Sequence, residues 1–178
     1  MIKRAILSCL MLERFVRLHI RASTAIHDRV PVLGRWLSLI FDRALLTLCG
    51  IDLTSHRIRV ATLSISHPAG VLLGGNGIVS AGRVAIMSGV KFVGSQPDDP
   101  EYLARAAVGD VFRLGDNVVI GANSVIIGPI DICDNVVIGA MSLVNRSITE
   151  PGTYVGVPVR RIRTETPGDQ WFAHMRGD

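Results

Sequence analysis

The sequence predicts a mainly β chain that winds into a triangular coil of parallel strands and begins with a helical segment. The main observation is a six-residue repeat, in which an aliphatic residue recurs without a slip at Leu114, Ile120, Ile126, Ile132, Ile138 and Val144. A helical period of about 3.6 would scatter these residues around a cylinder, and a period of two would require apolar residues where Asp116 and Asp134 stand. Composition agrees, since 48% hydrophobic residues with only 5% aromatic ones suit a narrow core of valine and isoleucine.

In such a coil each hexapeptide forms one short strand and one turn, three hexapeptides make a rung, and the rungs stack with parallel hydrogen bonding. The recurring aliphatic residue then points inward. Small or β-branched residues four positions later fill the narrow core, at Val118, Ser124, Val136 and Ser142. Glycine follows the aliphatic residue at Gly115, Gly121 and Gly139. Glycine suits a corner with a positive φ or a close approach of neighbouring backbone.

The period can be followed backwards, with faults, so we expect the coil to occupy residues 51–163 and a C-terminal tail to occupy 164–178. The repeat stops between residues 94 and 111, where prolines and acidic residues interrupt it. An excursion of this length in a repeat array often forms a binding face. A sandwich of short strands is the alternative, but it requires irregular spacings of about 8 to 12 residues.

Residues 1–50 have apolar residues at three- and four-residue spacing with basic residues between them. This pattern predicts two helices joined around Pro31. A helical cap on the open end of the coil is the simpler interpretation, and contact of the basic helices with a membrane surface is the alternative. Glu13 and Arg14 interrupt the first apolar run and no Ala-x-Ala site follows, so we expect no signal peptide. The expected location is the cytoplasm, with peripheral contact to a membrane left open.

The cysteines and the net charge exclude some classes of function. Cys9, Cys49 and Cys133 have no paired spacing, which argues against a disulfide framework or a cysteine zinc site. The formal charge of +4 lies mostly in residues 1–60 and 160–163, without an aromatic platform or a recognition-helix motif. We therefore expect no nucleic-acid partner, and a small anionic molecule such as a phosphate compound accounts for the same charges.

Candidate catalytic residues are few, because the predicted coil contains only two histidines, His56 and His67. Asp52 precedes His67 by 15 residues, which is nearly one rung, and stacked rungs are separated by about 4.8 Å. The Asp52 carboxylate is then placed to accept a hydrogen bond from one imidazole nitrogen while the other faces a cleft. Asp52 would orient the ring, and His67 would act as a general base. A purely structural histidine is the alternative.

Several segments resemble the hexapeptide-repeat acyltransferases of the left-handed β-helix type. They are Gly50-Ile51-Asp52, the block Ser66-His67-Pro68-Ala69-Gly70, the regular repeats and the closing segment 151–162. Within that family the chain is most similar to the serine acetyltransferase branch and its relatives that O-acetylate sugars and polysaccharides. The resemblance covers residues 50–163. It implies that His67, assisted by Asp52, removes a proton from the acceptor, which attacks the thioester of acetyl-CoA directly.

The resemblance also implies a homotrimer in which acetyl-CoA lies along a groove between two coils. By position, it assigns the pantetheine arm to Gly121, Ala122, Gly139 and Ala140, where side chains larger than methyl would obstruct a close approach. It points to Arg160 and Arg161 for the phosphates of the cofactor. No metal is expected, because the three-histidine sites of metalloenzymes on this scaffold need more histidines than the coil provides.

One departure from the family pattern concerns the acceptor. Serine acetyltransferases carry a second active-site histidine in a His-Pro-Lys-Ile block just before the regular repeats, where this chain has residues 111–114, Val-Phe-Arg-Leu. The preceding acidic loop offers Asp98, Asp99 and Glu101, whose carboxylates suit sugar hydroxyls better than the carboxylate of serine. We therefore expect an acetyl-CoA-dependent O-acetyltransferase acting on a sugar or polysaccharide hydroxyl. Serine O-acetylation and amino-sugar N-acetylation remain the alternatives.

Overall fold

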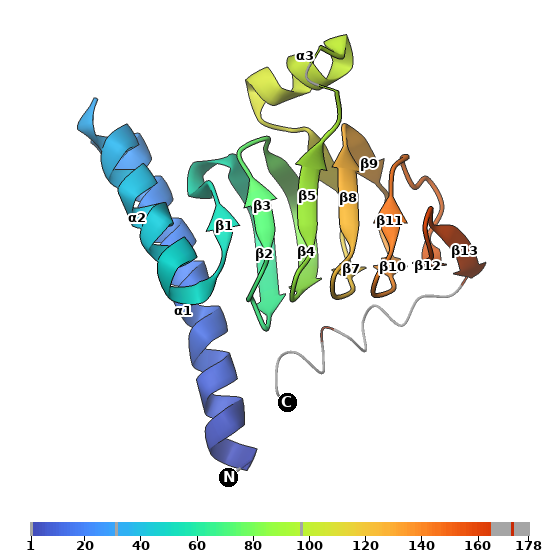
Figure 1. Ribbon diagram of the computed structural model, residues 1–178, viewed down its shortest axis with the longest axis horizontal. Coiled ribbons are helices and arrows are strands. Elements are labelled where there is room, and N and C mark those ends of the chain that lie inside the picture. The colour runs from blue at the N-terminus through green and yellow to red at the C-terminus, as the bar shows by residue number, and fades with distance from the viewer. Residues whose placement is uncertain (1, 31, 97, 165–171, 173–178) are drawn as a thin grey trace.

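The chain forms a coil of short strands with a pair of helices at one end (Figure 1). The structure is a computed structural model that describes residues 2–30, 32–96, 98–164 and 172, with side chains from residue 14 onward. The helices are α1 (Ile2–Arg29) and α2 (Leu33–Cys49), which pack against each other and against the first strands of the coil. The two helices expected in residues 1–50 are thus present.

Two curled sheets make the walls of the coil. The five-stranded sheet contains, in spatial order, β1 (Asp52–Leu53), β3 (Leu72–Gly74), β5 (Lys91–Gly94), β8 (Val125–Gly128) and β11 (Leu143–Val144). The eight-stranded sheet contains β2 (Ile58–Ser66), β4 (Ile78–Met87), β6 (Phe112–Leu114), β7 (Val118–Ile120), β9 (Ile130–Ile132), β10 (Val136–Ile138), β12 (Gly152–Val155) and β13 (Arg160–Arg163). A 3-10 turn, η1 (Ser55–Arg57), follows β1. The strands pair in parallel except β12 and β13, which are antiparallel.

The predicted inward columns are confirmed. Val136 pairs with Val118 and Ile138 pairs with Ile120, an offset of 18 residues that equals three hexapeptides. All six recurring aliphatic residues are buried, and so are the small residues four positions later. The repeat therefore specifies the core because each rung places the same side chain above its equivalent in the next rung.

At the corners of the regular rungs, the backbone conformation with positive φ is adopted by residues other than glycine. The residues with positive φ in the regular rungs are Asn117, Asn123, Asn135 and Met141. Asparagine tolerates this conformation better than other side chains. Gly115, Gly121 and Gly139 are required instead by close approach: a Cβ on Gly121 would lie 2.5 Å from the backbone nitrogen of Ala140. Of the two alternative reasons expected for glycine at these positions, close approach is therefore the one that applies.

The helix pair encloses polar groups that fasten it to the coil. The buried carboxylate of Asp42 accepts hydrogen bonds from the backbone nitrogen of Ser55 (2.9 Å) and from its hydroxyl (2.6 Å). His19 Nε2 lies 3.4 Å from the same carboxylate, and the Ser23 hydroxyl donates to the carbonyl of Ser38. Because Ser55 belongs to η1, these contacts tie α1 and α2 to the first rung.

These buried groups predict that stability falls in mild acid. Burial lowers the pKa of His19, and burial together with the nearby His27 and Arg57 lowers the pKa of His56. The native state therefore keeps both rings neutral where the unfolded chain takes up protons, from about pH 6.5 downward. We expect the free energy of unfolding to fall as the pH is lowered through that range. Urea titrations at several pH values should show a weaker pH dependence of the free energy of unfolding in a double variant with His19→Gln and His56→Gln. An unchanged pH dependence would contradict the role of these two histidines.

Phe172 covers part of the outer surface of the eight-stranded sheet. It packs on outward-facing residues of β4, β7 and β10, namely Ala85, Val119 and Val137. The Arg83 guanidinium lies 5.1 Å from the centre of the Phe172 ring. Phe172 therefore covers part of this face of the coil, whereas none of the labelled elements lies in front of the five-stranded sheet in Figure 1.

Candidate active site

His67 occupies a corner at the end of β2. The strand ends at Ser66, His67 has a φ of 52°, and the Val71 backbone nitrogen closes a turn by donating to the carbonyl of Pro68 (3.2 Å). The side chain is exposed. The φ of His67 lies in the left-handed region, whereas a following proline favours extended backbone in the residue before it, so the corner holds His67 in an uncommon conformation.

The corner that carries His67 is longer than the corner stacked on it. Before the corner, Ser66 pairs with Met87 at an offset of 21 residues, and after it Leu72 pairs with Lys91 at an offset of 19. The first corner therefore has two more residues than its neighbour. A longer turn on the same stack must bulge outward, which accounts for the exposure of the imidazole.

The pairing register places His67 at the head of a column of corner residues. In the strands, Ser66 pairs with Met87, Ile86 with Ile120, and Ile120 with Ile138. Extending this register by one or two residues aligns His67, Ser88, Ala122 and Ala140. Hydrogen bonds support this alignment, since Asn123 N donates to Ser88 O and Met141 N donates to Ala122 O, both at 2.9 Å. The proposed base and the two alanines predicted to adjoin the cofactor thus lie along one edge of the coil.

Asp52 lies on the other side of the His67 corner. It belongs to β1 and pairs with Leu72, while the preceding Gly50 accepts a hydrogen bond from Gly70. Its half-exposed carboxylate accepts a hydrogen bond from Arg43 Nη1 at 3.3 Å, a partner that the sequence did not suggest. The structure brings Asp52 and His67 to one corner, and the hydrogen bond between them stays a prediction.

The glycines and alanines assigned to the cofactor form a smooth strip of backbone. Gly121 donates to the carbonyl of Ile138 and Gly139 donates to the carbonyl of Tyr154, each at 2.8 Å. Ala122 is half-buried and Ala140 is exposed. A ligand lying along this corner would meet methyl groups and peptide edges, so the geometry is compatible with a long, narrow cofactor. Contact with a cofactor stays a prediction.

Arg160 and Arg161 lie in β13, at the opposite end of the stack. The path from β2 to β13 through neighbouring strands crosses five interstrand spacings, and at about 4.8 Å each these amount to about 24 Å. Arg160 is exposed, whereas Arg161 is half-buried and forms an ion pair with Glu150. An elongated cofactor reaching from His67 toward the arginines would therefore run along the whole column, with Arg160 the more accessible of the two.

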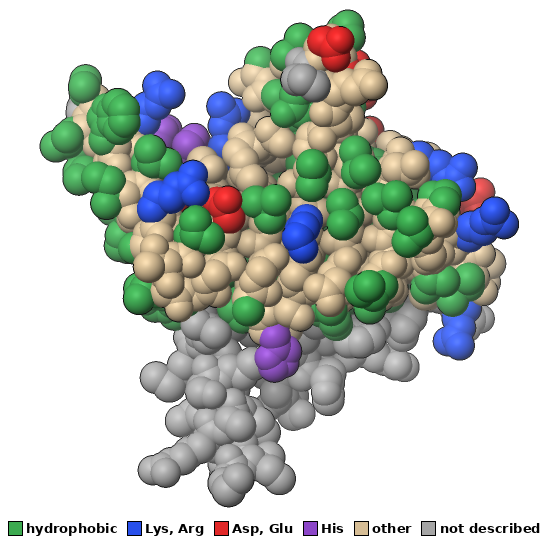
Figure 2. Space-filling model, viewed as in Figure 1, with side chains coloured by type: hydrophobic (Ala, Val, Ile, Leu, Met, Phe, Trp, Pro, Cys, Tyr) green, Lys and Arg blue, Asp and Glu red, His purple; other side chains and the backbone are tan. Residues whose placement is uncertain are grey.

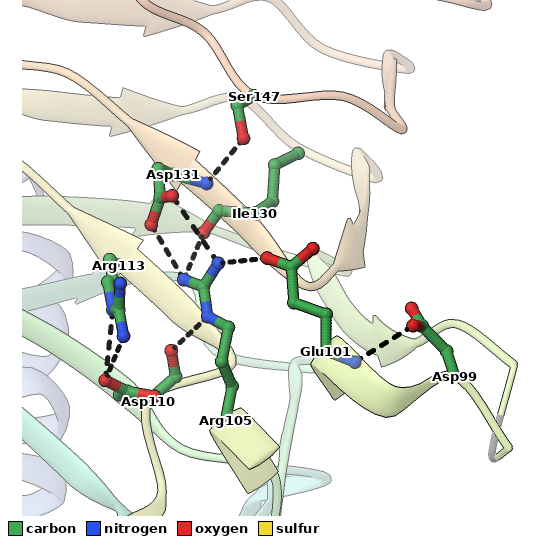
Figure 3. Close-up of polar contacts among 8 residues, drawn as sticks. All are labelled: Asp99, Glu101, Arg105, Asp110, Arg113, Ile130, Asp131 and Ser147. Atoms are coloured by element: carbon green, nitrogen blue, oxygen red, sulfur yellow. Dashed lines mark hydrogen bonds and ion pairs between the residues drawn. The ribbon is translucent and has the colours of Figure 1, made fainter. Parts of the chain in front are cut away.

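The acidic residues expected to bind the acceptor make contacts within their own loop (Figure 3). The excursion folds as a helix, α3 (Pro100–Val108), which the sequence analysis did not predict. Asp99 caps its N-terminus by accepting from the Glu101 backbone nitrogen (3.0 Å), and Glu101 pairs with Arg105 (3.3 Å). Asp98 is exposed. Asp99 and Glu101 thus stabilise the loop, and their binding of an acceptor stays a prediction.

Arg105 anchors α3 to the coil, and the sequence analysis missed it. Its buried guanidinium donates to Asp131 (2.7 Å), to the carbonyl of Ile130 (3.3 Å) and to the carbonyl of Asp110 (3.2 Å) (Figure 3). The only available signal was an arginine facing the same side of the helix as Glu101. Its distant partner Asp131 can be identified only from the fold.

Replacing Arg105 with methionine should release α3 while leaving the coil folded. The change removes several charge-assisted hydrogen bonds from a buried group, so we expect a loss of about 1–3 kcal/mol of stability. Hydrogen exchange should accelerate in the amides of α3. Arg113→Met is the matched control, because Arg113 forms only a half-exposed pair with Asp110 and should contribute less than about 1 kcal/mol. Equal effects of the two substitutions would contradict the anchoring role.

Comparison with known proteins agrees with this geometry. Residues 113–146 match the family model for the bacterial transferase hexapeptide (six repeats). The chain therefore contains this hexapeptide repeat, and its fold is that of the serine acetyltransferases. The serine acetyltransferase of Neisseria gonorrhoeae is 28% identical with a TM-score of 0.67, over 86% of this chain and 57% of that one. The soybean enzyme complexed with serine is 26% identical with a TM-score of 0.64, over 82% and 56%.

This structural similarity confirms the predicted fold, a left-handed β-helix with N-terminal helices. The serine acetyltransferase of Vibrio cholerae, at 23% identity and a TM-score of 0.67, shares the fold. The chain spans just over half the length of these structures. No curated protein sequence matches the chain.

This chain has residues 111–114, Val-Phe-Arg-Leu, where the family resemblance places a second active-site histidine in serine acetyltransferases. Val111 and Phe112 are fully buried, and the Phe112 ring contacts Phe92 edge to face with ring centres 5.0 Å apart. This stretch therefore contributes to the core. Within the described ranges, no three histidine, cysteine or acidic side chains lie close enough together to hold a metal ion.

Proposed function

We propose that the protein transfers an acetyl group from acetyl-CoA to a hydroxyl group of an acceptor, with His67 as the general base. The observation that carries the proposal is the column that begins at His67 and continues through Ala122 and Ala140 along one edge of the coil. The identity with two serine acetyltransferases over most of this chain supports it. The transferase activity of proteins with this repeat gives further support.

The reaction follows from the placement of the imidazole. His67 takes the proton of the acceptor hydroxyl as its oxygen attacks the thioester carbonyl, and the tetrahedral intermediate then breaks its carbon–sulfur bond. The departing thiolate receives the proton from the imidazolium, which returns His67 to its neutral form. Asp52 is proposed to orient the ring, and its pairing with Arg43 holds the carboxylate at the same corner.

The likeness to known structures favours free serine as the acceptor. One of the similar structures is a serine acetyltransferase complexed with serine. The main argument for a sugar acceptor is weaker than the sequence suggested, because Asp99 and Glu101 are engaged in capping and pairing within α3. One observation still favours a sugar or polysaccharide hydroxyl: residues 111 and 112 fill the core at the place where, by the family resemblance, serine acetyltransferases have a second active-site histidine.

The protein is proposed to form a homotrimer in which the outer face of the five-stranded sheet packs against a neighbouring subunit. Its outward residues are largely aliphatic: Leu72, Val93, Val125, Ile127 and Leu143. Figure 2 shows such side chains spread over this face, interrupted by basic groups. A neighbouring coil packed here would lie beside the His67 column and form a groove with it. Light scattering should give three subunits, and a monodisperse monomer would contradict the proposal.

The cytoplasm is the proposed location of the reaction. Cys49 and Cys133 are both free thiols, as is usual in a reducing compartment. Acetyl-CoA is the proposed donor, and no metal is needed for the proposed chemistry.

The test is release of CoA thiol from acetyl-CoA with a set of acceptors: L-serine, nucleotide sugars, amino sugars and short oligosaccharides. Turnover with serine would assign the chain to the chemistry of its structural relatives. Turnover with a glycan hydroxyl and not with serine would support the sugar acceptor. Turnover with amino sugars alone would contradict O-acetylation, and failure to bind acetyl-CoA in calorimetry would overturn the whole proposal.

A further inference from the structure

The helix α2 turns its polar face toward the rest of the protein and its apolar face outward. The residues it buries are Gly34, Ser38, Asp42 and Leu45, of which only one is a large apolar residue. The residues it exposes include an apolar row, four of them at three- and four-residue spacing and the fifth about two turns further on, which we call the outer stripe: Leu33, Trp36, Leu37, Ile40 and Leu48. Their exposed fractions range from 42% to 75%. An ordinary surface helix has the opposite arrangement.

Further apolar side chains are exposed on the same pair of helices. Val32 is 91% exposed just before α2, and Phe15 and Leu18 of α1 are exposed as well. Figure 2 shows hydrophobic side chains gathered over α2 at the left of the view, with basic groups beside them. Single exposed apolar residues are common, but a row of them on one helix is typical of a surface that contacts a membrane or another molecule.

Charge identifies the kind of surface that would cover the outer stripe. Residues 14–49 contain six arginines and two aspartates, a net charge of +4. The only acid of α2, Asp42, is buried, and Asp28 of α1 pairs with His27. Arg35 is exposed beside Trp36. A second copy packed on the same stripe would bring arginines together without an exposed α2 carboxylate to pair with them, whereas lipid phosphates would neutralise them.

We propose that the outer stripe lies on the surface of an anionic lipid bilayer, with α2 in the plane of the membrane interface. Leucine and isoleucine would enter the acyl boundary, and the amphipathic ring of Trp36 would sit at the level of the headgroups. The buried hydrogen bonds of Asp42 would remain on the protein side. No helix in the described part of the chain is long and apolar enough to span a bilayer, which is consistent with a helix lying on the surface.

Such docking would orient the candidate active site. α2 ends at Cys49, and the carbonyl of the following residue, Gly50, accepts a hydrogen bond from the backbone nitrogen of Gly70, three residues after His67. The corner that carries His67 therefore lies at the end of the docked helix, close to the lipid surface. The docking itself does not depend on the proposed reaction.

The test is flotation of the full chain with vesicles of phosphatidylcholine, alone or with phosphatidylglycerol. We expect binding to the phosphatidylglycerol vesicles, weakened by added salt, and little binding to phosphatidylcholine alone. The double variant Trp36→Ser with Ile40→Ser should bind at least about tenfold more weakly. Both side chains are exposed, so the variant should fold. The control is the pair Leu103→Ser and Val108→Ser on α3, equally exposed residues whose loss should leave vesicle binding unchanged.

Two results with the wild type and the stripe variant, and one with the control, would overturn the proposal. One is the absence of binding to phosphatidylglycerol vesicles at low salt. The other is a double variant of the outer stripe that forms smaller oligomers in light scattering but binds vesicles as the wild type does, which would make the stripe an interface between proteins. An equal loss of binding in the α3 control would likewise contradict a role specific to α2.

Discussion

Replacing His67 with alanine is expected to lower acetyl transfer by about 10²- to 10⁴-fold, the usual contribution of a positioned general base. The exposed imidazole stands at the head of the corner column, and no equivalent group follows it at Ser88, Ala122 or Ala140. The substitution should not destabilise the fold, because the side chain is at the surface. The measurement is the rate of CoA thiol release with whichever acceptor supports turnover.

His56→Ala is the control for that experiment. His56 is the other histidine of the coil and stacks on His27, with ring centres 3.9 Å apart. It lies in η1, at a different corner, so its loss should affect stability more than turnover. Full activity of the His67 variant would show that another group, or the nucleophile's own reactivity, takes the role of the base. Acetyl-CoA binding measured by calorimetry should be retained in both variants.

Replacing Gly121 with alanine should cost about 1–3 kcal/mol of stability or more. A Cβ at this position would lie 2.5 Å from the backbone nitrogen of Ala140 and 2.7 Å from the carbonyl carbon of Gly139. Both atoms belong to the backbone of the next rung and cannot rotate away. The rungs would have to separate, which would break parallel hydrogen bonds on both sides of the corner. Urea unfolding would measure the change.

Gly75→Ala is the matched control for the corner glycine. Its nearest neighbour would be the Thr54 hydroxyl at 3.5 Å, an ordinary contact, and its φ is not in the left-handed region. We expect a change within about 0.5 kcal/mol, or a slight stabilisation. Similar stability of the Gly121 and Gly75 variants would mean that the rungs are more deformable than their contacts indicate.

The regular part of the coil was predictable because one repeated unit determines both its strands and its core. Because Ile120 and Ile138 occupy the same position in successive rungs, each residue between them has a known position in its rung. The helix α3 could also have been found, since Asp99 and Pro100 form a start signal and Gly109 a stop signal. These signals lie in the segment where the hexapeptide repeat stops, so the period itself gives no indication of them.

Parts of the candidate site depend on contacts that the sequence does not encode locally. Arg43 beside Asp52 and Arg105 beside Asp131 join residues from separate elements. The orientation of α2 is a further example: periodicity shows that one face is apolar, but not which face is buried. Ser55 of the coil binds Asp42 and thereby turns the polar face inward.

The antiparallel return of β13 has a consequence for the growth of the coil. A stack of identical parallel rungs has no intrinsic length, because its last rung presents the same unpaired backbone as every rung before it. β13 runs against β12 and places Arg160, Arg161 and Arg163 at that edge. The reversed strand direction and the row of positive charges both disfavour the addition of another molecule, while α1 and α2 obstruct the opposite end (Figure 1). The same features that cap the two ends therefore keep a self-templating architecture from elongating into filaments.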